Sequence, residues 1–269
     1  ISTSKKLSID EDTNLTYEKN KNIIFIIADM LQGSIVEQYF ISNPDIQENF
    51  QGFTTYTRAI SPFPFTLYSL PAMLSGKTYP AKDDNNYPNN WNAARINSFV
   101  TDAQKKGFNS TVIGIGEELK MHASQRNYET SITPISLGDT LLKLSSNRIA
   151  KTPILFKIVL NLTFYNVVTS DLNYLISLKL ESNKLLSRLS TEPVGTHQKR
   201  VQLIHNFMPH TPVIFKKTDE EIPKNYYRPI ELSPDAVMDE LDYFFIKISN
   251  FINHLKKIGV YDESLIIIA

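Results

Sequence analysis

Asp29 is the first residue of this sequence whose type and place could support chemistry. It lies in the segment NIIFIIADM (22–30), where six apolar residues precede it. A short, β-branched, continuous apolar run predicts a strand that is buried on both faces of a parallel sheet. Ligands of open α/β sheets bind outside the carboxyl ends of the strands. A carboxylate there can hold a metal ion; the alternative is that Asp29 only caps a following helix.

A hydroxyl group stands at Thr66, within the segment SPFPFTLYSLPAMLSG (61–76). The prolines before it restrict the backbone, and residues 67–75 predict a short helix that ends at Gly76. A helix that begins here would direct unpaired N–H groups and the positive end of its dipole toward a phosphate or sulfate group. Thr66 could then be a nucleophile if a base or a metal activates it, and otherwise it caps the helix.

Two histidines follow a predicted strand in the segment HNFMPHTP (205–212). His210 lies between Pro209 and Pro212, which favour an extended and stiff backbone. Its imidazole could bind a metal or donate a hydrogen bond to a phosphoryl oxygen, and the alternative is a loop or core histidine. His205 lies within the strand itself, so we predict a structural role for it.

Strands and helices alternate along the chain. This order predicts one α/β domain over residues 22–269, with a mostly parallel central sheet flanked by helices, preceded by a polar linker or arm over residues 1–21. The predicted strands are 22–30, 53–61, 109–116, 200–207 and 264–269, and the predicted helices are 67–75, 96–108 and 233–260, with helical spacing also at 137–146 and 171–189.

Composition excludes several classes of function. The 28 basic and 28 acidic residues give zero net charge, whereas proteins that bind nucleic acid usually carry a basic excess. The absence of cysteine excludes disulfides, thiolate metal sites and a cysteine nucleophile. No apolar run reaches the ~18 residues that a membrane-spanning helix needs. Because the sequence stops inside an apolar strand, we expect a C-terminally truncated domain.

In their order and spacing, four segments resemble one known family. They are NIIFIIADM, SPFPFTLYSLPAMLSG, HNFMPHTP and the stretch from Glu240 to Ala269. The resemblance is to the sulfatase-like branch of the alkaline phosphatase superfamily, closest to the membrane-anchored phosphoethanolamine and phosphoglycerol transferases. It covers residues 22–80, 96–116 and 200–269, and the role of residues 120–195 stays open.

The resemblance implies a role for each candidate residue. Asp29 would be the first metal-binding carboxylate, Thr66 both nucleophile and metal ligand, and His210 a contact to the substrate. The implied cofactor is a divalent metal, with Zn²⁺ expected and Mg²⁺, Mn²⁺ or Ca²⁺ as alternatives. In true sulfatases the nucleophile is a Cys or Ser that is oxidised to formylglycine. Threonine cannot form that aldehyde, because its β-carbon carries a methyl group, so the resemblance favours a phospho-threonine intermediate.

The sequence ends at Ala269. The family continues beyond the corresponding position with an Asp-His-Gly stretch that completes the metal site. We therefore expect this chain alone to be inactive.

The expected function is metal-dependent transfer of a phosphoethanolamine or phosphoglycerol type head group from a phospholipid donor to a glycan or lipid acceptor. Its expected place is the extracytoplasmic, periplasmic face of a bacterial inner membrane, with anchoring segments outside this chain and no nucleic acid partner. The alternatives are a phosphodiesterase or sulfatase-like hydrolase, a non-catalytic lipid-binding or regulatory domain of the same fold, and an unrelated α/β domain.

Overall fold

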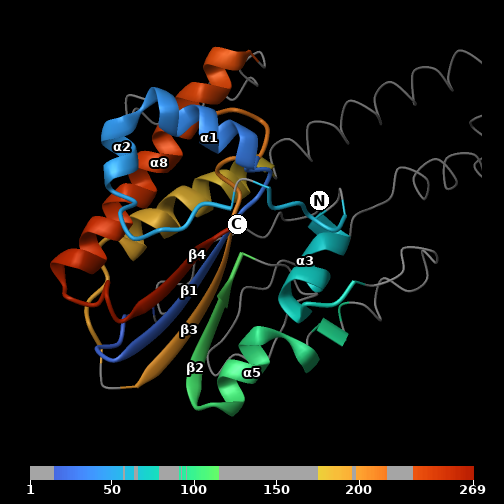
Figure 1. The fold of residues 1–269 in the computed structure, drawn as a ribbon, viewed down its shortest axis with the longest axis vertical. Helices are drawn as coiled ribbons and strands as arrows, with labels where there is room; N and C mark the ends of the chain where they lie inside the picture. Colours follow the sequence, from blue (N-terminus) through green and yellow to red (C-terminus); the bar gives the residue numbers. More distant parts are fainter. Residues whose placement is uncertain are drawn as a thin grey trace, which may run out of the picture.

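A four-stranded parallel sheet lies at the centre of the chain (Figure 1). The strands are β1 (Lys21–Ala28), β2 (Phe108–Ile113), β3 (Lys199–Asn206) and β4 (Ser264–Ile268), in the spatial order β2-β3-β1-β4. This computed structural model describes residues 15–56, 58–63, 66–78, 91, 93–94, 96–114, 175–195, 198–216 and 233–269. The predicted α/β class, with a parallel sheet flanked by helices, is confirmed.

The central strand β1 is buried on both of its faces. Ile24 and Ile26 contribute to one hydrophobic core, and Phe25 and Ile27 contribute to the other. Successive side chains of a strand point to opposite faces, so an uninterrupted apolar run supplies both cores at once. This is why the sequence NIIFIIA forms a central strand and not an edge strand.

One face of the sheet is covered by α8 (Pro234–Lys257), α1 (Gly33–Ser42), α2 (Pro44–Glu48) and the helical residues 175–189 (Figure 1). Helix α8 begins where Ser233 accepts a hydrogen bond from the Ala236 amide at 3.2 Å. The core side chains of α8 include Leu241, Phe244, Phe245, Ile248, Phe251, Ile252 and Leu255. Burial of each contributes roughly 1.5–3 kcal/mol, so α8 is the main apolar cover of this face.

The opposite face is covered by α3 (Thr66–Ser75) and α5 (Phe99–Lys105) (Figure 1). Leu70 and Leu74 of α3 lie in the same apolar cluster as Phe25 and Ile27 of β1. Helix α3 is therefore held against the sheet by its apolar side, and its first residue lies near the carboxyl end of β1.

Two predicted segments differ from the structure. The strand predicted at 53–61 is irregular in all of its described residues. The arm predicted at 1–21 is packed over its described part, because Leu15 and Tyr17 are fully buried. The Tyr17 hydroxyl donates to the Leu189 carbonyl at 2.6 Å, and Glu18 pairs with Arg200 at 3.3 Å inside the protein. Residues 1–14 and the helical pattern at 137–146 lie outside the described residues.

A glycine after β2 permits close approach to the end of β3. Gly114 has a φ of +76°, and a Cβ added to it would overlap the carbonyl oxygen of His205. Gly107 has a similar φ of +83°, but nothing lies within 4 Å of its added Cβ. A comparison of alanine variants at Gly107 and Gly114 therefore distinguishes the cost of the left-handed backbone from the cost of steric overlap with His205.

We expect Gly114→Ala to destabilise the protein more than Gly107→Ala. The left-handed backbone costs about 1–2 kcal/mol at either position, and overlap with His205 should add at least about 1 kcal/mol at Gly114. Urea denaturation of both variants measures the difference. Equal losses of unfolding free energy would show that β2 and β3 do not need this close approach.

Candidate active site

Asp29 lies at the carboxyl end of β1. Its amide donates to the Asn206 carbonyl at 2.9 Å, which extends the pairing of β1 with β3 by one residue. The side chain is 10% exposed. The next residue, Met30, has a φ of +66°, a conformation that non-glycine residues adopt at a cost. Such strain concentrates at functional sites, so the sharp turn after Asp29 marks this edge as a candidate site.

Thr66 is the first residue of α3, and its side chain faces Asp29. The Thr66 hydroxyl donates to Asp29 Oδ1 at 3.1 Å. The first N–H groups of a helix have no partner within that helix, so the 10-residue α3 opens beside the carboxylate with its positive dipole end. Asp29 and Thr66, which the resemblance assigns to one metal site, are therefore in contact, and their chemical roles stay predictions.

His205 is the third side chain of this site. Its Nε2 lies 3.3 Å from Asp29 Oδ2, and its side chain is buried. In the sheet, His205 pairs with Ile27, and Asp29 is two residues after Ile27. Since side chains alternate along a strand, Asp29 and His205 lie on the same face of the sheet, the face that α3 covers. The sequence analysis assigned His205 a structural role. Its place beside Asp29 follows from the register between β1 and β3, which a single strand sequence does not reveal.

The surroundings of Asp29 keep its carboxyl group ionised. Burial acts to raise its pKa, but the contact with His205, the nearby imidazoles of His205 and His210, and the hydrogen bond from Thr66 outweigh burial. The pKa of Asp29 is consequently lowered from its ordinary value of 3.8. A carboxylate with a lowered pKa is a weak base, so this group suits a bound cation better than proton abstraction.

His210 lies near Asp29 in a loop after β3. It is half-buried, and its Nδ1 forms a hydrogen bond with the Thr211 carbonyl oxygen. It influences Asp29 through charge. The structure therefore brings His210 to the same edge of the sheet, while the predicted contact to a substrate stays a prediction.

A buried lysine fixes the loop that carries His210. Lys179, from the helical residues 175–189, donates to the carbonyl oxygens of His210 and Pro212 and forms an ion pair with Glu240 of α8. Glu240 Oε2 also accepts from the Ile214 amide at 2.8 Å. Burial lowers the pKa of Lys179 to about 8, although the Glu240 carboxylate opposes this shift. Sequence reasoning missed this pair, because a lysine in a helical pattern usually belongs to a solvated face.

The ligand types at Asp29 are suitable for a divalent cation. They are one carboxylate, one imidazole and one hydroxyl group, and the Nε2 of His205 is buried without a hydrogen-bond partner. Within the described ranges, no group of three His, Cys, Asp or Glu residues could hold a metal ion. Asp29, Thr66 and His205 could therefore hold such an ion only together with a further ligand.

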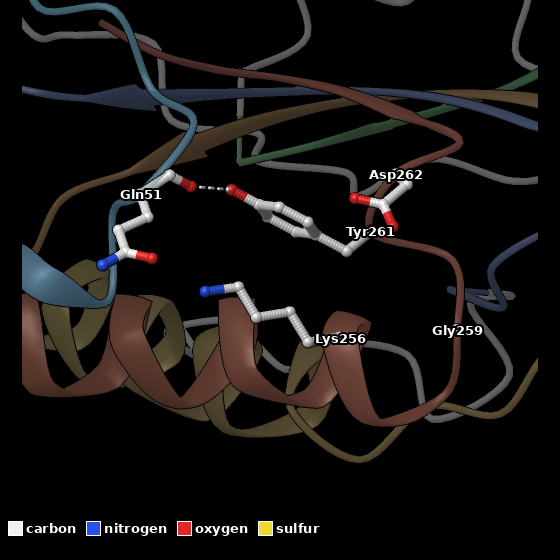
Figure 2. A pocket seen from close by; sticks show the side chains of 5 residues that line it. All are labelled: Gln51, Lys256, Gly259, Tyr261 and Asp262. Atoms are coloured by element: carbon white, nitrogen blue, oxygen red, sulfur yellow. Dashed lines mark hydrogen bonds between the residues drawn. The ribbon is translucent and has the colours of Figure 1, made fainter.

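A surface pocket of about 290 Å³ lies elsewhere (Figure 2). It is lined by Gln51, Lys256, Gly259, Tyr261 and Asp262. Tyr261 donates to the Gln51 carbonyl at 2.8 Å, and the Lys256 ammonium lies over the Tyr261 ring. Because residues 259–262 precede β4, this pocket lies at the amino end of that strand and not at the edge that carries Asp29.

Comparison with known proteins gives no assignment. Neither a scan of protein-family models nor a comparison with curated protein sequences finds a match to this chain. None of the helices in the described part of the chain is long and apolar enough to cross a membrane.

We expect Lys179→Met to destabilise the protein by about 3–5 kcal/mol, because it leaves Glu240 buried without a counter-charge. Lys184→Met is the matched control: Lys184 comes from the same helix, its side chain is 63% exposed, and its pair with Glu181 should contribute less than about 1 kcal/mol. Urea denaturation measures both effects. A loss below about 1 kcal/mol in Lys179→Met would show that the loop is not held by this contact.

Proposed function

We propose that this chain is the core of a metal-dependent transferase that moves a phosphoryl-linked head group through a phospho-threonine intermediate. The observation that supports this proposal most is the hydrogen bond from Thr66 to Asp29 at the carboxyl edge of the sheet. It combines a hydroxyl group, an ionised carboxylate and the first turn of a helix in one place. Phosphoryl transfer needs these parts: a nucleophile, a site for a cation, and N–H groups for the phosphoryl oxygens.

Within the α/β class, we propose that the chain has the alkaline phosphatase and sulfatase-like fold. Its support is the order of the elements: a first strand that ends in Asp29, a helix that opens at Thr66, a strand followed by His210, and the long helix α8 leading to β4 beside β1. This order matches the segments that carry the sequence resemblance.

The proposed reaction has two balanced steps. In the first, Thr66 Oγ1 attacks the phosphorus of a phospholipid and forms a new P–O bond, while the bond from phosphorus to the diacylglycerol oxygen breaks. The hydroxyl proton passes to water, and the diacylglycerol oxygen gains a proton from water. In the second, an acceptor hydroxyl attacks phosphorus and loses its proton to water, the bond from phosphorus to Thr66 Oγ1 breaks, and Oγ1 takes up a proton from water to restore the hydroxyl.

The residues of this chain position the reaction. A divalent cation such as Zn²⁺, when bound, would neutralise charge on the phosphoryl oxygens and favour loss of the hydroxyl proton. Asp29 and Thr66 would hold it, and Mg²⁺, Mn²⁺ or Ca²⁺ are the alternatives. The first N–H groups of α3 and the imidazole of His210 would stabilise the developing negative charge. His210 is the proposed substrate contact.

The proposed substrates and place rest on the sequence resemblance. The donor would be a phospholipid with a phosphoethanolamine or phosphoglycerol head group, and the acceptor a glycan or lipid. The proposed place is the extracytoplasmic, periplasmic face of a bacterial inner membrane, reached through segments outside this chain. With water as acceptor, the same site would be a phosphodiesterase.

The test is turnover of a phospholipid by the complete gene product. Vesicles would carry phosphatidylethanolamine and phosphatidylglycerol with fluorescent acyl chains, and release of fluorescent diacylglycerol would be followed by chromatography. We expect Thr66→Ala to lower the rate at least about 10³-fold, because it removes the nucleophile. Thr66→Ser is the matched control: it keeps a hydroxyl group and should retain far more activity.

Each outcome decides between the alternatives. Unchanged release in folded Thr66→Ala would remove this hydroxyl from the mechanism. Release of the free phosphorylated head group with water as the sole acceptor would favour the hydrolase. Binding of the vesicles without any turnover would favour the non-catalytic lipid-binding domain.

A further inference from the structure

We propose that His205 is a ligand of the catalytic cation, in addition to Asp29 and Thr66. This inference rests on the proposed function, and it assigns to the site a residue that the family resemblance does not include. It begins from one atom: Nε2 of His205 is buried and forms no well-aligned hydrogen bond, although it lies 3.3 Å from Asp29 Oδ2. A buried nitrogen that faces a carboxylate without an aligned hydrogen bond calls for an explanation, such as an ion bound by both groups.

The separations of the polar atoms agree with shared coordination. His205 Nε2 lies 3.3 Å from Asp29 Oδ2, and Thr66 Oγ1 lies 3.1 Å from Asp29 Oδ1. Two ligand atoms on one tetrahedral Zn²⁺ stand about 3.4 Å apart, given metal–ligand bonds of about 2.0–2.2 Å. The two contacts use different oxygens of Asp29, so a shared ion would require the carboxylate to turn or to bind through both oxygens. A further ligand would complete the four of a tetrahedral zinc site.

The backbone fixes His205 in this place. Its pairing with Ile27 aligns it with the end of β1, and Gly114 approaches its carbonyl oxygen closely. The His205 imidazole ring also packs against the Phe207 ring, and the two ring centroids are 4.3 Å apart. A ligand that is held by a sheet and a ring contact loses little freedom when an ion binds.

His254 is a suitable contrast within the same chain. It is a half-buried histidine of α8, and its Nε2 lies 2.7 Å from the Glu192 carbonyl oxygen. Both of these histidines lie against other elements, but only the Nε2 of His205 lacks a hydrogen-bond partner and faces a carboxylate. If loss of any packed histidine weakens zinc binding, variants of both His205 and His254 should show it. If His205 is a ligand, only the His205 variant should bind zinc more weakly.

The test is zinc binding by the complete gene product, measured by calorimetry with ZnCl₂ at constant pH. We expect His205→Phe, which preserves the ring volume, to weaken zinc binding by more than about tenfold, since even residues that only support a ligand cost about 10–100-fold. Asp29→Asn should weaken binding as well, and His254→Phe should leave it unchanged. Circular dichroism confirms that each variant is folded.

Equal zinc affinity in His205→Phe and wild type would overturn the inference while leaving the proposed function intact, because Thr66 turnover tests that function separately. Absence of zinc binding in the wild type would overturn it too. If His205→Phe does not fold, the wild type labelled with ¹⁵N-histidine gives the answer. Zinc must then shift the ring signal of His205 and not that of His254, and an unshifted His205 signal rejects the inference.

Discussion

The hydrogen bond between Thr66 and Asp29 joins two elements that the chain separates by 37 positions. Asp29 is placed by the pairing of β1 with β3, and Thr66 by the contacts of Leu70 and Leu74 with the apolar cluster beneath α3. Packing therefore brings the helix start to the carboxylate, and the hydrogen bond fixes the remaining distance. Because the carboxylate stays ionised, this edge of the sheet keeps a negative charge that a cation can neutralise.

Buried charge also positions the segments around the site. Lys179 and Glu240 hold the loop of His210 against two helices, and Arg200 with Glu18 holds the N-terminal segment against β3. Buried ion pairs seldom add net stability, because both charges lose their hydration. Their contribution here is to fix where each segment lies, and the site depends on that placement.

Apolar runs made much of this fold predictable. The strands 22–30, 200–207 and 264–269 and the helix at 233–260 follow from continuous or periodic apolar residues. Asp29 and Thr66 were identified as candidates from their places at a strand end and a helix start. His205 could not be placed, because one strand does not reveal its register with another. The segment 53–61 has β-branched and aromatic residues, but its described residues form no strand, because β propensity alone does not decide whether a segment joins a sheet.

The proposed reaction depends on Thr66 Oγ1 as the atom that bonds to phosphorus. The most direct measurement is mass spectrometry of peptides from the complete gene product after brief exposure to phosphatidylethanolamine vesicles and rapid acid quenching. The account predicts one phosphoethanolamine group attached to the peptide that contains Thr66, and its disappearance when an acceptor is added. An adduct on a different residue, or turnover with no adduct at any time, would contradict it.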